Sequence, residues 1–491
     1  MSRIERPVLV QVVLVALLAA GALVSVSSPV GVAEVSDAAD PRPNIILISS
    51  DDQRAADMVA MEATRRLLGG RGTTFDHAYA PFPLCCPSRA SILTGQYAHN
   101  HGVLGNGGGP TPVGGVVDFD DTSTLATWLD DVGYETAFVG KYLNNYGENE
   151  PLLVPPGRDD WHASVGNGDY DHGWVFENGV VNAYDDIYAT DLARDIAVEA
   201  IERHVSSTAP FFLWASFYAP HSGTPDEPDD PVGGLSTPAV APRHHDAYAG
   251  TPLPKDPSFN EADVSDKPAF VRDRHRISPT TEANLTELYQ QRLEALLALD
   301  EAVVQMIDAL EAAGELENTI IVFTSDNGYM LGEHRIHAGK TVAYEPSARV
   351  PLVVAGPGFP PGVTRSQPVA LIDLAPTLVE AARATAGLEI DGTSLRPIAR
   401  KPAIGANRTL VIEAGPEEVD GPWLYRGIRT REYVYLEYEA TGEVEYYDMA
   451  RDPYQLVNLA YQPDSRTQRK LDLLSARLDV MYDCAGAACR R

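Results

Sequence analysis

Three carboxylates and one amide stand in two short polar segments, each of which follows an apolar run. Asp51 and Asp52 come directly after the run 44–50, and Asp326 and Asn327 come directly after the run 319–325. All four side chains offer hard oxygen ligands, without a histidine or a thiolate among them. Such a set suits Ca²⁺ or Mg²⁺ rather than zinc. A divalent cation would also relieve the repulsion between neighbouring carboxylates.

Two more reactive residues follow apolar runs in the same way. Lys141 follows the run 136–140, and His221 follows the run 210–218. Sites in open α/β sheets gather at the carboxyl ends of strands. Asp or Asn after one strand is also ordinary turn chemistry. Four strand ends that all carry reactive residue types indicate one shared site.

The adjacent cysteines Cys85 and Cys86 follow Leu84 in the segment LCCPSRASILTGQ at residues 84–96. Pro87 suits the first turn of a helix that runs to about Leu93. Cys85 would then lie at a helix N-terminus, where free N–H groups and the helix dipole favour an anion. The structural alternative for Cys85 is a buried, inert cysteine, and this packing role is the one we expect for Cys86.

The elements that must position these residues alternate along the chain. Apolar runs predict strands at 44–50, 136–140, 210–218, 319–325 and 350–355. Amphipathic stretches predict helices at 124–131, 188–205 and 287–313. This alternation predicts an α/β fold with a large, mostly parallel sheet between helices. The Pro-, Asp- and Gly-rich residues 222–280 break the alternation and predict a long loop beside the site.

The character of the sequence changes near residue 400. Short β-branched and aromatic segments predict a four-stranded antiparallel sheet with strands at 408–414, 423–430, 432–438 and 444–449. A helix at 465–481 is expected to follow. We therefore expect a catalytic α/β domain over 44–400 and a smaller α+β subdomain over 401–491.

The N-terminus and the composition restrict the function classes. Residues 1–33 resemble a secretory signal peptide with an apolar stretch from Val8, followed by a linker over 34–43; an uncleaved membrane anchor is the alternative. Secretion or attachment to the cell envelope is expected. The chain has 491 residues, enough for a sizeable core, and a net charge of −31, which argues against a nucleic-acid partner. In an exported chain, Cys484 and Cys489 are expected to form a disulfide.

The string C-x-P-S-R-x-x-x-L-T-G, which begins at Cys85, resembles the signature of the sulfatase family. The resemblance spans roughly residue 43 to the C-terminus and implies an alkaline-phosphatase-like fold. It also implies that Cys85 is oxidised after translation to formylglycine by a formylglycine-generating enzyme. One hydroxyl of the aldehyde hydrate would attack the sulfur of a sulfate ester. The other would later expel sulfate and regenerate the aldehyde.

The same resemblance implies a role for each site residue. Segments like Ser50–Gln53 and Ser325–Gly328 supply the metal site of the family, and the metal is usually calcium. The resemblance therefore implies that the ligands here are Asp51, Asp52, Asp326 and Asn327. The oxygen at position 85 would complete the ligand set. Arg89 would hold the aldehyde hydrate and the metal-site carboxylates. Lys141 and Lys340 would bind sulfate oxygens. His221 would protonate the leaving alcohol.

The segments FVGKYLNNYG, APHS and TSDNGY and the terminal CAGAAC are most similar to N-acetylglucosamine-6-sulfatases and related glycosaminoglycan sulfatases. That subgroup also ends in a paired-cysteine loop. Many sulfatases carry a histidine two residues after the lysine that matches Lys141, and it acts as the base that collapses the sulfated intermediate; here Leu143 stands there. The base must come from elsewhere, and the candidates are Asn144, His101, His334 and His337. His99 and His101 either line the pocket or form a structural turn.

Three functions are compatible with these sequence features. The first is a sulfuric ester hydrolase that acts on a sugar or small aryl sulfate. The second is a phosphonate monoester or phosphodiester hydrolase with the same metal and nucleophile. The third is a carbohydrate-binding protein in which Cys85 stays unconverted. The acidic composition favours oligosaccharides or small esters over long sulfated polymers, and the sequence does not indicate an oligomeric state.

Overall fold

The computed structural model of the chain describes residues 40, 42–108, 113–148, 152–170, 172–223, 235–419 and 421–490, which belong to one compact unit. The predicted signal peptide 1–33 and most of the predicted linker 34–43 lie outside these residues. Within the described ranges, no helix combines the length and the apolar character needed to cross a membrane.

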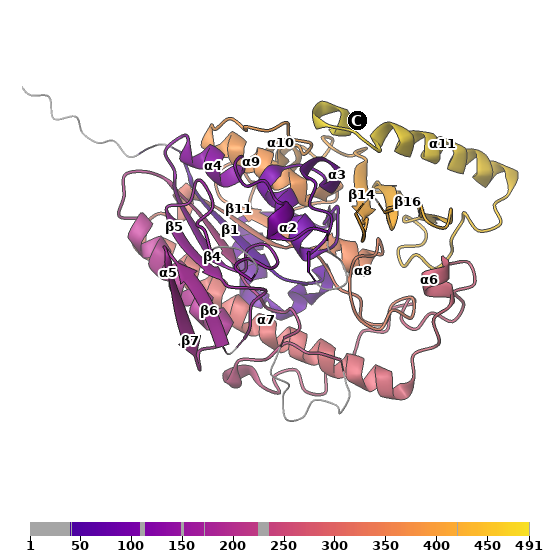
Figure 1. Cartoon of the computed structure of the whole chain (residues 1–491), viewed down its shortest axis with the longest axis horizontal. Helices are drawn as coiled ribbons and strands as arrows, with labels where there is room; N and C mark the ends of the chain where they lie inside the picture. Colours follow the sequence, from indigo (N-terminus) through magenta and orange to yellow (C-terminus); the bar gives the residue numbers. More distant parts are fainter. Residues whose placement is uncertain are drawn as a thin grey trace, which may run out of the picture. The chain divides into compact units, whose positions relative to one another are not determined.

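A ten-stranded mixed sheet forms the centre of this unit, with the strand order β12-β2-β11-β9-β1-β8-β4-β5-β6-β7 (Figure 1). The bounds of its strands are β1 Asn44–Ser50, β2 Gly72–Phe75, β4 Glu135–Gly140, β5 Asp160–Ser164, β6 His172–Glu177, β7 Val180–Asp185, β8 Phe211–Ser216, β9 Thr319–Ser325, β11 Leu352–Ala355 and β12 Val363–Arg365. The neighbours β9, β1, β8, β4 and β5 all run parallel. Antiparallel pairing begins outside this parallel centre, at β11 on one side and β6 on the other.

The predicted strands 44–50 and 319–325 are confirmed with these bounds, and 136–140 and 210–218 correspond to β4 and β8. The single strand predicted at 350–355 is wrong. The strand is interrupted at Pro351, because proline has no N–H to donate to the hydrogen bonds between strands. Before the break, β10 (Arg349–Val350) joins β3 (Ala78–Tyr79) and β13 (Val369–Ala370) in a separate sheet, and after it β11 runs antiparallel to β9.

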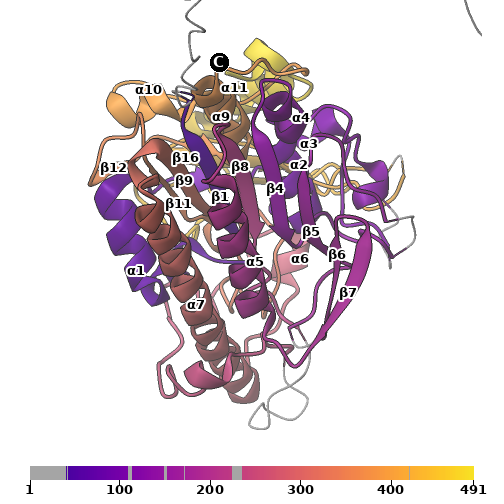
Figure 2. The same ribbon diagram turned by 90° about the vertical axis from the view of Figure 1, so that its left-hand side faces the viewer.

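Two helical layers cover the sheet because its central strands are apolar on both faces. In β1, Ile45 and Leu47 pack on one side, and Ile46 and Ile48 pack on the other. The second side is covered by α5 (Ala189–His204) and α7 (Pro279–Ala313), which lie in front of the sheet in Figure 2. The first side is covered by α2 (Cys85–Thr94), α4 (Leu125–Asp130) and α9 (Leu374–Ala382).

The predicted helices 124–131 and 188–205 correspond to α4 and α5. The helix predicted at 287–313 begins earlier, at Pro279, because the Ser278 hydroxyl caps its first turn by accepting a hydrogen bond from the Thr281 N–H. The predicted loop 222–280 is largely irregular where it is described and contains only one short α-helix, α6 (Ala269–Arg272). The other short helices are α1 (Glu62–Thr64), α3 (Ala98–His101), α8 (Glu345–Ala348) and α10 (Leu395–Arg400).

The C-terminal part forms a separate antiparallel sheet, as predicted. Its strands are β14 (Leu410–Ala414), β15 (Tyr425–Arg429), β16 (Tyr433–Glu437) and β17 (Val444–Asp448). The helix α11 (Ser465–Met481) has the predicted bounds, and the Asp464 carboxylate caps it. A disulfide joins Cys484 and Cys489. The predicted domain boundary near residue 400 stays a prediction.

Candidate active site

The predicted site residues meet at the carboxyl ends of the parallel strands. Asp51 and Asp52 follow β1, Lys141 follows β4, and Asp326 follows β9, which lies beside β1 in the sheet. Asp52 has a φ of 67°, an uncommon left-handed backbone conformation for a residue other than glycine. Its N–H donates to Oδ1 of Asp326 over 3.1 Å, so the two strand ends are joined directly.

Cys85 is the first residue of α2, at the helix N-terminus that the sequence predicted. Its Sγ lies 3.4 Å from Oδ1 of Asp51, 2.8 Å from Nζ of Lys340 and 3.7 Å from Nζ of Lys141. Lys141 also donates to Asp51 over 2.5 Å, and Lys340 donates to Asp52. Two ammonium groups and a helix N-terminus thus surround the atom that the sequence marks as the nucleophile, an arrangement that favours a bound oxyanion.

Arg89 joins the two acidic segments from the first turns of α2. It is fully buried, and its guanidinium donates to Oδ2 of Asp326 over 2.8 Å and to Oδ2 of Asp51 over 3.1 Å. It also donates to the Lys141 carbonyl and the Ser216 hydroxyl, each over 2.6 Å. The planar fork of an arginine can serve all of these acceptors at once, whereas the single ammonium of a lysine cannot.

The buried ionisable groups of the site shift one another's pKa values. Burial opposes ionisation of Asp51, but Lys141, His221 and Arg89 reverse this effect and hold the pKa of that carboxyl well below its usual range. For Asp326, burial and the charge of Asp51 raise the pKa to about 6. Burial raises the pKa of the Cys85 thiol to about 12. The encoded thiol is therefore a poor nucleophile at neutral pH, because the thiolate is the reactive form.

A divalent cation fits the donor set of this site. Ligand atoms of Asp51, Asp52, Cys85 and His221 lie within 4.8 Å of one another. Asn327 donates from its amide nitrogen to Oδ1 of Asp52 over 2.6 Å, and its buried amide oxygen has no hydrogen-bond partner among the described residues. Buried oxygens normally have partners, and these donors are mostly the hard oxygens that Ca²⁺ and Mg²⁺ prefer. The structure thus brings all the predicted metal-site residues together, with Asp326 and Asn327 in direct contact with Asp52.

His221 lies at the open side of the site. Its side chain is 27% exposed, and its Nε2 lies 3.7 Å from Oδ2 of Asp52. Its Nδ1 donates to the Ser222 carbonyl over 2.6 Å, which directs Nε2 toward the acidic cluster. Burial lowers the pKa of His221 to about 4. An imidazole placed in this way can exchange a proton with a group bound above Cys85.

Two supporting residues were not identified from the sequence. Arg292 is fully buried in α7, where it donates to the Asp52 and Pro220 carbonyls and so fixes both site segments. An arginine among the leucines of an amphipathic face was the available signal. The ring of Tyr218 lies 5.4 Å from Nζ of Lys141 and 4.8 Å from the His221 ring. A tyrosine at the end of an apolar run carries no comparable signal.

Three of the four candidates for the missing base have side chains that contact residues other than Cys85. His101 contacts the Ser91 hydroxyl over 3.0 Å, and burial lowers its pKa to about 3. His334 contacts Glu261 over 2.6 Å, Asn144 donates to Asn167 over 3.0 Å, and His337 is exposed. His99 is hydrogen-bonded to Glu413 and to the Cys484 carbonyl. These bonds agree with the second alternative given for His99, a structural turn. Leu143 is fully buried.

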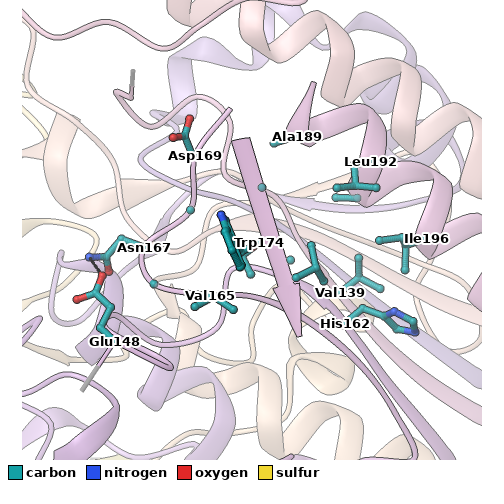
Figure 3. Close-up of a pocket in the computed structure, with 17 residues that line it drawn as sticks. Val139, Glu148, His162, Val165, Asn167, Asp169, Trp174, Ala189, Leu192 and Ile196 are labelled. Atoms are coloured by element: carbon teal, nitrogen blue, oxygen red, sulfur yellow. Dashed lines mark hydrogen bonds between the residues drawn. The ribbon is translucent and has the colours of Figure 1, made fainter. Parts of the chain in front are cut away.

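A cavity of about 300 Å³ flanks the site beyond the ends of β4 and β5. Gly140, the residue before Lys141, lines it, and so does Gly168, which faces the Tyr218 ring. Figure 3 shows Val139, Leu192 and Ile196 at one side, with Glu148, Asn167 and Asp169 at the other. This cavity therefore has an apolar wall and a polar, acidic rim.

Comparisons with known proteins agree with this geometry. The sequence profile of the sulfatase family matches residues 43–384, and a profile described as the C-terminal part of N-sulphoglucosamine sulphohydrolase matches residues 332–480. An N-acetylglucosamine-6-sulfatase of Capra hircus is 31% identical over 91% of this chain and 85% of its own length. An arylsulfatase of Volvox carteri is 31% identical over 92% of this chain and 76% of its own length.

Solved structures show the same fold. One, a protein in complex with its substrate D-glucosamine-2-N,6-O-disulfate, has a TM-score of 0.72 and 26% identity and covers 89% of this chain and 98% of its own. A phosphonate monoester hydrolase of Agrobacterium radiobacter has a TM-score of 0.62 and 21% identity over 90% and 95% of the two chains, so it shows the fold alone. The family profile, the two relatives and the site built around Cys85 lead to one conclusion: the chain belongs to the sulfatase family.

Proposed function

We propose that this protein hydrolyses a sugar O-sulfate to the alcohol and inorganic sulfate, with a formylglycine derived from Cys85 as the nucleophilic residue. The observation that carries the proposal is the position of Cys85. Cys85 is the first residue of α2, and its side chain is buried. Its Sγ lies 2.8 Å from Nζ of Lys340 and 3.7 Å from Nζ of Lys141. These contacts suit an ester that carries negative charge on three oxygens.

Each neighbour of Cys85 has a task in this proposal. Lys141 and Lys340 bind the sulfate oxygens and stabilise the charge that gathers on them in the transition state. Arg89 holds Asp51 and Asp326 in place and orients the converted side chain. His221 protonates the leaving alcohol oxygen through Nε2, which faces the site at its open side. In the free protein the proton of the neutral imidazole lies on Nδ1 and the pKa is about 4, so this role requires the negative charge of the bound sulfate to raise that pKa until Nε2 is protonated. Aldehyde hydration at position 85 would supply the oxygen nucleophile.

We also assign a Ca²⁺ site to Asp51, Asp52, Asp326 and Asn327, with the oxygen at position 85 as a further ligand and Mg²⁺ as the alternative ion. The support is the buried, unpartnered Asn327 oxygen and the three carboxylates around it. A bound divalent cation would act as a Lewis acid toward sulfate oxygen. The three cationic side chains that contact these carboxylates balance their three formal negative charges.

The substrate class follows from the relatives. Three of them are N-acetylglucosamine-6-sulfatases, and a solved neighbour is bound to a disulfated glucosamine. We therefore propose a sulfated amino sugar as the substrate. Two further relatives are described as extracellular sulfatases, which supports secretion through the predicted signal peptide. A formylglycine-generating enzyme is the maturation partner that the proposal requires.

The test compares the sulfate and phosphate esters of one alcohol, 4-nitrophenol, and adds one sugar sulfate. Protein with converted Cys85 is assayed on 4-nitrophenyl sulfate, 4-nitrophenyl phosphate and glucosamine 6-sulfate, with and without a chelator. The proposal expects sulfate release to exceed phosphate release by at least about a hundredfold and to fall on chelation. Faster turnover of phosphate or phosphonate esters would instead favour the hydrolase whose fold this chain shares.

A further inference from the structure

The ring of Tyr218 packs against His221, the side chain to which we assign protonation of the leaving alcohol. The centroids of the two rings are 4.8 Å apart, with an angle of 31° between the ring planes. In the described part of the chain, no second aromatic ring contacts the His221 ring. Because the His221 side chain lies at the open side of the site and is partly exposed, it depends on Tyr218 for this packing.

Tyr218 and His221 also share one hydrogen-bond acceptor. The Tyr218 hydroxyl donates to the Ser222 carbonyl over 3.0 Å, and Nδ1 of His221 donates to the same oxygen over 2.6 Å. A carbonyl oxygen has two lone pairs, so it can accept both bonds. The backbone N–H of His221 in turn donates to the Tyr218 carbonyl over 2.9 Å. The ring, the hydroxyl and the backbone of Tyr218 thus all restrict the direction in which Nε2 of His221 points.

Tyr218 is itself held in place by its neighbours. The ring of Tyr170 lies 5.0 Å from the Tyr218 ring, and the Tyr170 hydroxyl donates to the His221 carbonyl over 2.8 Å. Two glycines leave room for the Tyr218 ring. A Cβ atom at Gly168 would lie 3.1 Å from a carbon of that ring, and one at Gly223 would lie 3.4 Å from another. Packing as close as this restricts the ring to one position.

The Tyr218 ring also lies 5.4 Å from Nζ of Lys141, so it contacts two groups of the proposed mechanism. These groups have different tasks. Lys141 binds sulfate oxygens, which every sulfate ester has, so its loss should slow all esters alike. His221 protonates the oxygen that leaves. A sugar alcohol is a poor leaving group and needs this proton, whereas 4-nitrophenol leaves readily without it.

From these contacts we infer that Tyr218 is a positioning residue for His221 and thereby adapts the site to sulfate esters of sugar alcohols. It keeps Nε2 directed at the leaving oxygen and acts on the substrate through His221. The inference rests on the proposed sulfate ester hydrolysis with His221 as the acid. It goes further by naming the residue on which the cleavage of esters with poor leaving groups depends.

The size of the effect follows from what each variant removes. Proton transfer by a positioned side chain contributes about 10²–10⁴-fold, so H221A should lower kcat for glucosamine 6-sulfate at least about a hundredfold. Y218L keeps the imidazole but removes the ring and the hydroxyl that direct it, and should lower the same kcat about ten- to a hundredfold. Y218F loses only one hydrogen bond, so its kcat should fall about two- to tenfold.

The experiment measures kcat and KM for glucosamine 6-sulfate and 4-nitrophenyl sulfate with the full-length converted protein, Y218F, Y218L, H221A and Y218L/H221A. Y188F is the matched control, because the Tyr188 hydroxyl also donates to a carbonyl, that of Ala239, over 3.0 Å, while its ring contacts Tyr170 rather than His221.

We expect Y218L to lower kcat for the sugar sulfate at least about five times more than kcat for the aryl sulfate. KM for both esters should stay within about threefold, since sulfate binding is retained. In the H221A background, Y218L should add less than about a twofold loss on the sugar sulfate, because the group that Tyr218 positions is already gone. Y188F should leave the ratio of the two kcat values unchanged.

The outcomes separate this inference from the proposed function. If the converted protein cleaves neither ester, the proposed function fails, and the inference fails with it. If H221A cleaves glucosamine 6-sulfate at the unmodified rate, His221 is not the acid, so the inference is overturned while sulfate ester hydrolysis stands. An equal loss on both esters in Y218F and Y218L would assign Tyr218 to Lys141 or to folding and would also overturn it. Losses that multiply in Y218L/H221A, or a changed ratio in Y188F, would do the same.

Discussion

Replacement of Arg89 by lysine tests whether the guanidinium fork holds the site together. The residue is fully buried and donates to two carboxylates, two carbonyls and one hydroxyl. Lysine keeps the positive charge but concentrates its donors on one nitrogen, so it cannot reach partners on opposite sides of the fork. R89K therefore changes hydrogen-bonding geometry at constant charge.

The magnitude follows from the contacts that are lost. At least two hydrogen bonds to charged or buried partners disappear, each worth about 1.5–3 kcal/mol. The free energy of unfolding should fall by about 3–6 kcal/mol, in the range for disruption of a buried ion pair. Sulfate release should fall as well, because Asp51 and Asp326 lose the group that joins them.

Urea unfolding followed by tryptophan fluorescence, with a chelator present, measures the stability change. The matched control is R71K, because Arg71 pairs with Glu317 on the surface, with 43% and 88% of the two side chains exposed. Exposed pairs contribute at most about 1 kcal/mol, so R71K should resemble the unmodified protein. An R89K variant within about 1 kcal/mol of the unmodified protein would refute the argument for the fork.

Three further predictions concern residues outside the reacting centre. Cys86→Ala should keep at least about half of the sulfatase activity, because this buried thiol packs against the core and bonds to the backbone of Asn144 and Gly115; loss of activity in a folded C86A protein would contradict that role. Cys484→Ser opens a disulfide loop with a separation of 5 residues and should lower the free energy of unfolding by about 2 kcal/mol, as measured by urea unfolding; no change under oxidising conditions would argue against the disulfide. Burial lowers the pKa of His162, but Asp160 and Glu177 outweigh burial and raise it overall, so its stabilising charge is present below about pH 6.5 and is lost at higher pH. The stability difference between the unmodified protein and H162Q should therefore shrink between about pH 6 and pH 9, and a growing difference would contradict the sign.

The strands that carry the site could be predicted from the sequence because they are buried on both faces. Residues 44–50 and 319–325 form continuous apolar runs that end at Asp51 and Asp326, so their bounds were readable. The helix α11 was also predicted with its observed bounds, and the structure shows that Asp464 caps its first turn. The strands β5 to β7 were not predicted, because residues such as His162 and Asn182 interrupt any apolar pattern.

The direction of β11 could not be predicted, since an apolar run looks the same in a parallel and an antiparallel pair. Pro351 was the signal for the break before it. For the site, the residues at strand ends and in the Cys85 segment were found because their types and spacing are unusual. Arg292 and Tyr218 were missed because their importance depends on distant contacts with Asp52 and Lys141 that only the folded chain creates.

The central claim is that Cys85 becomes an aldehyde and cleaves sulfate esters. Peptide mass spectrometry across Cys85, on secreted protein that is also assayed with glucosamine 6-sulfate, tests it most directly. The account predicts an aldehyde at position 85, sulfate release that rises with the converted fraction, and loss of that release in C85A. A fully converted protein that releases no sulfate from aryl or sugar esters, or an unconverted protein that releases it at the same rate, would contradict the account.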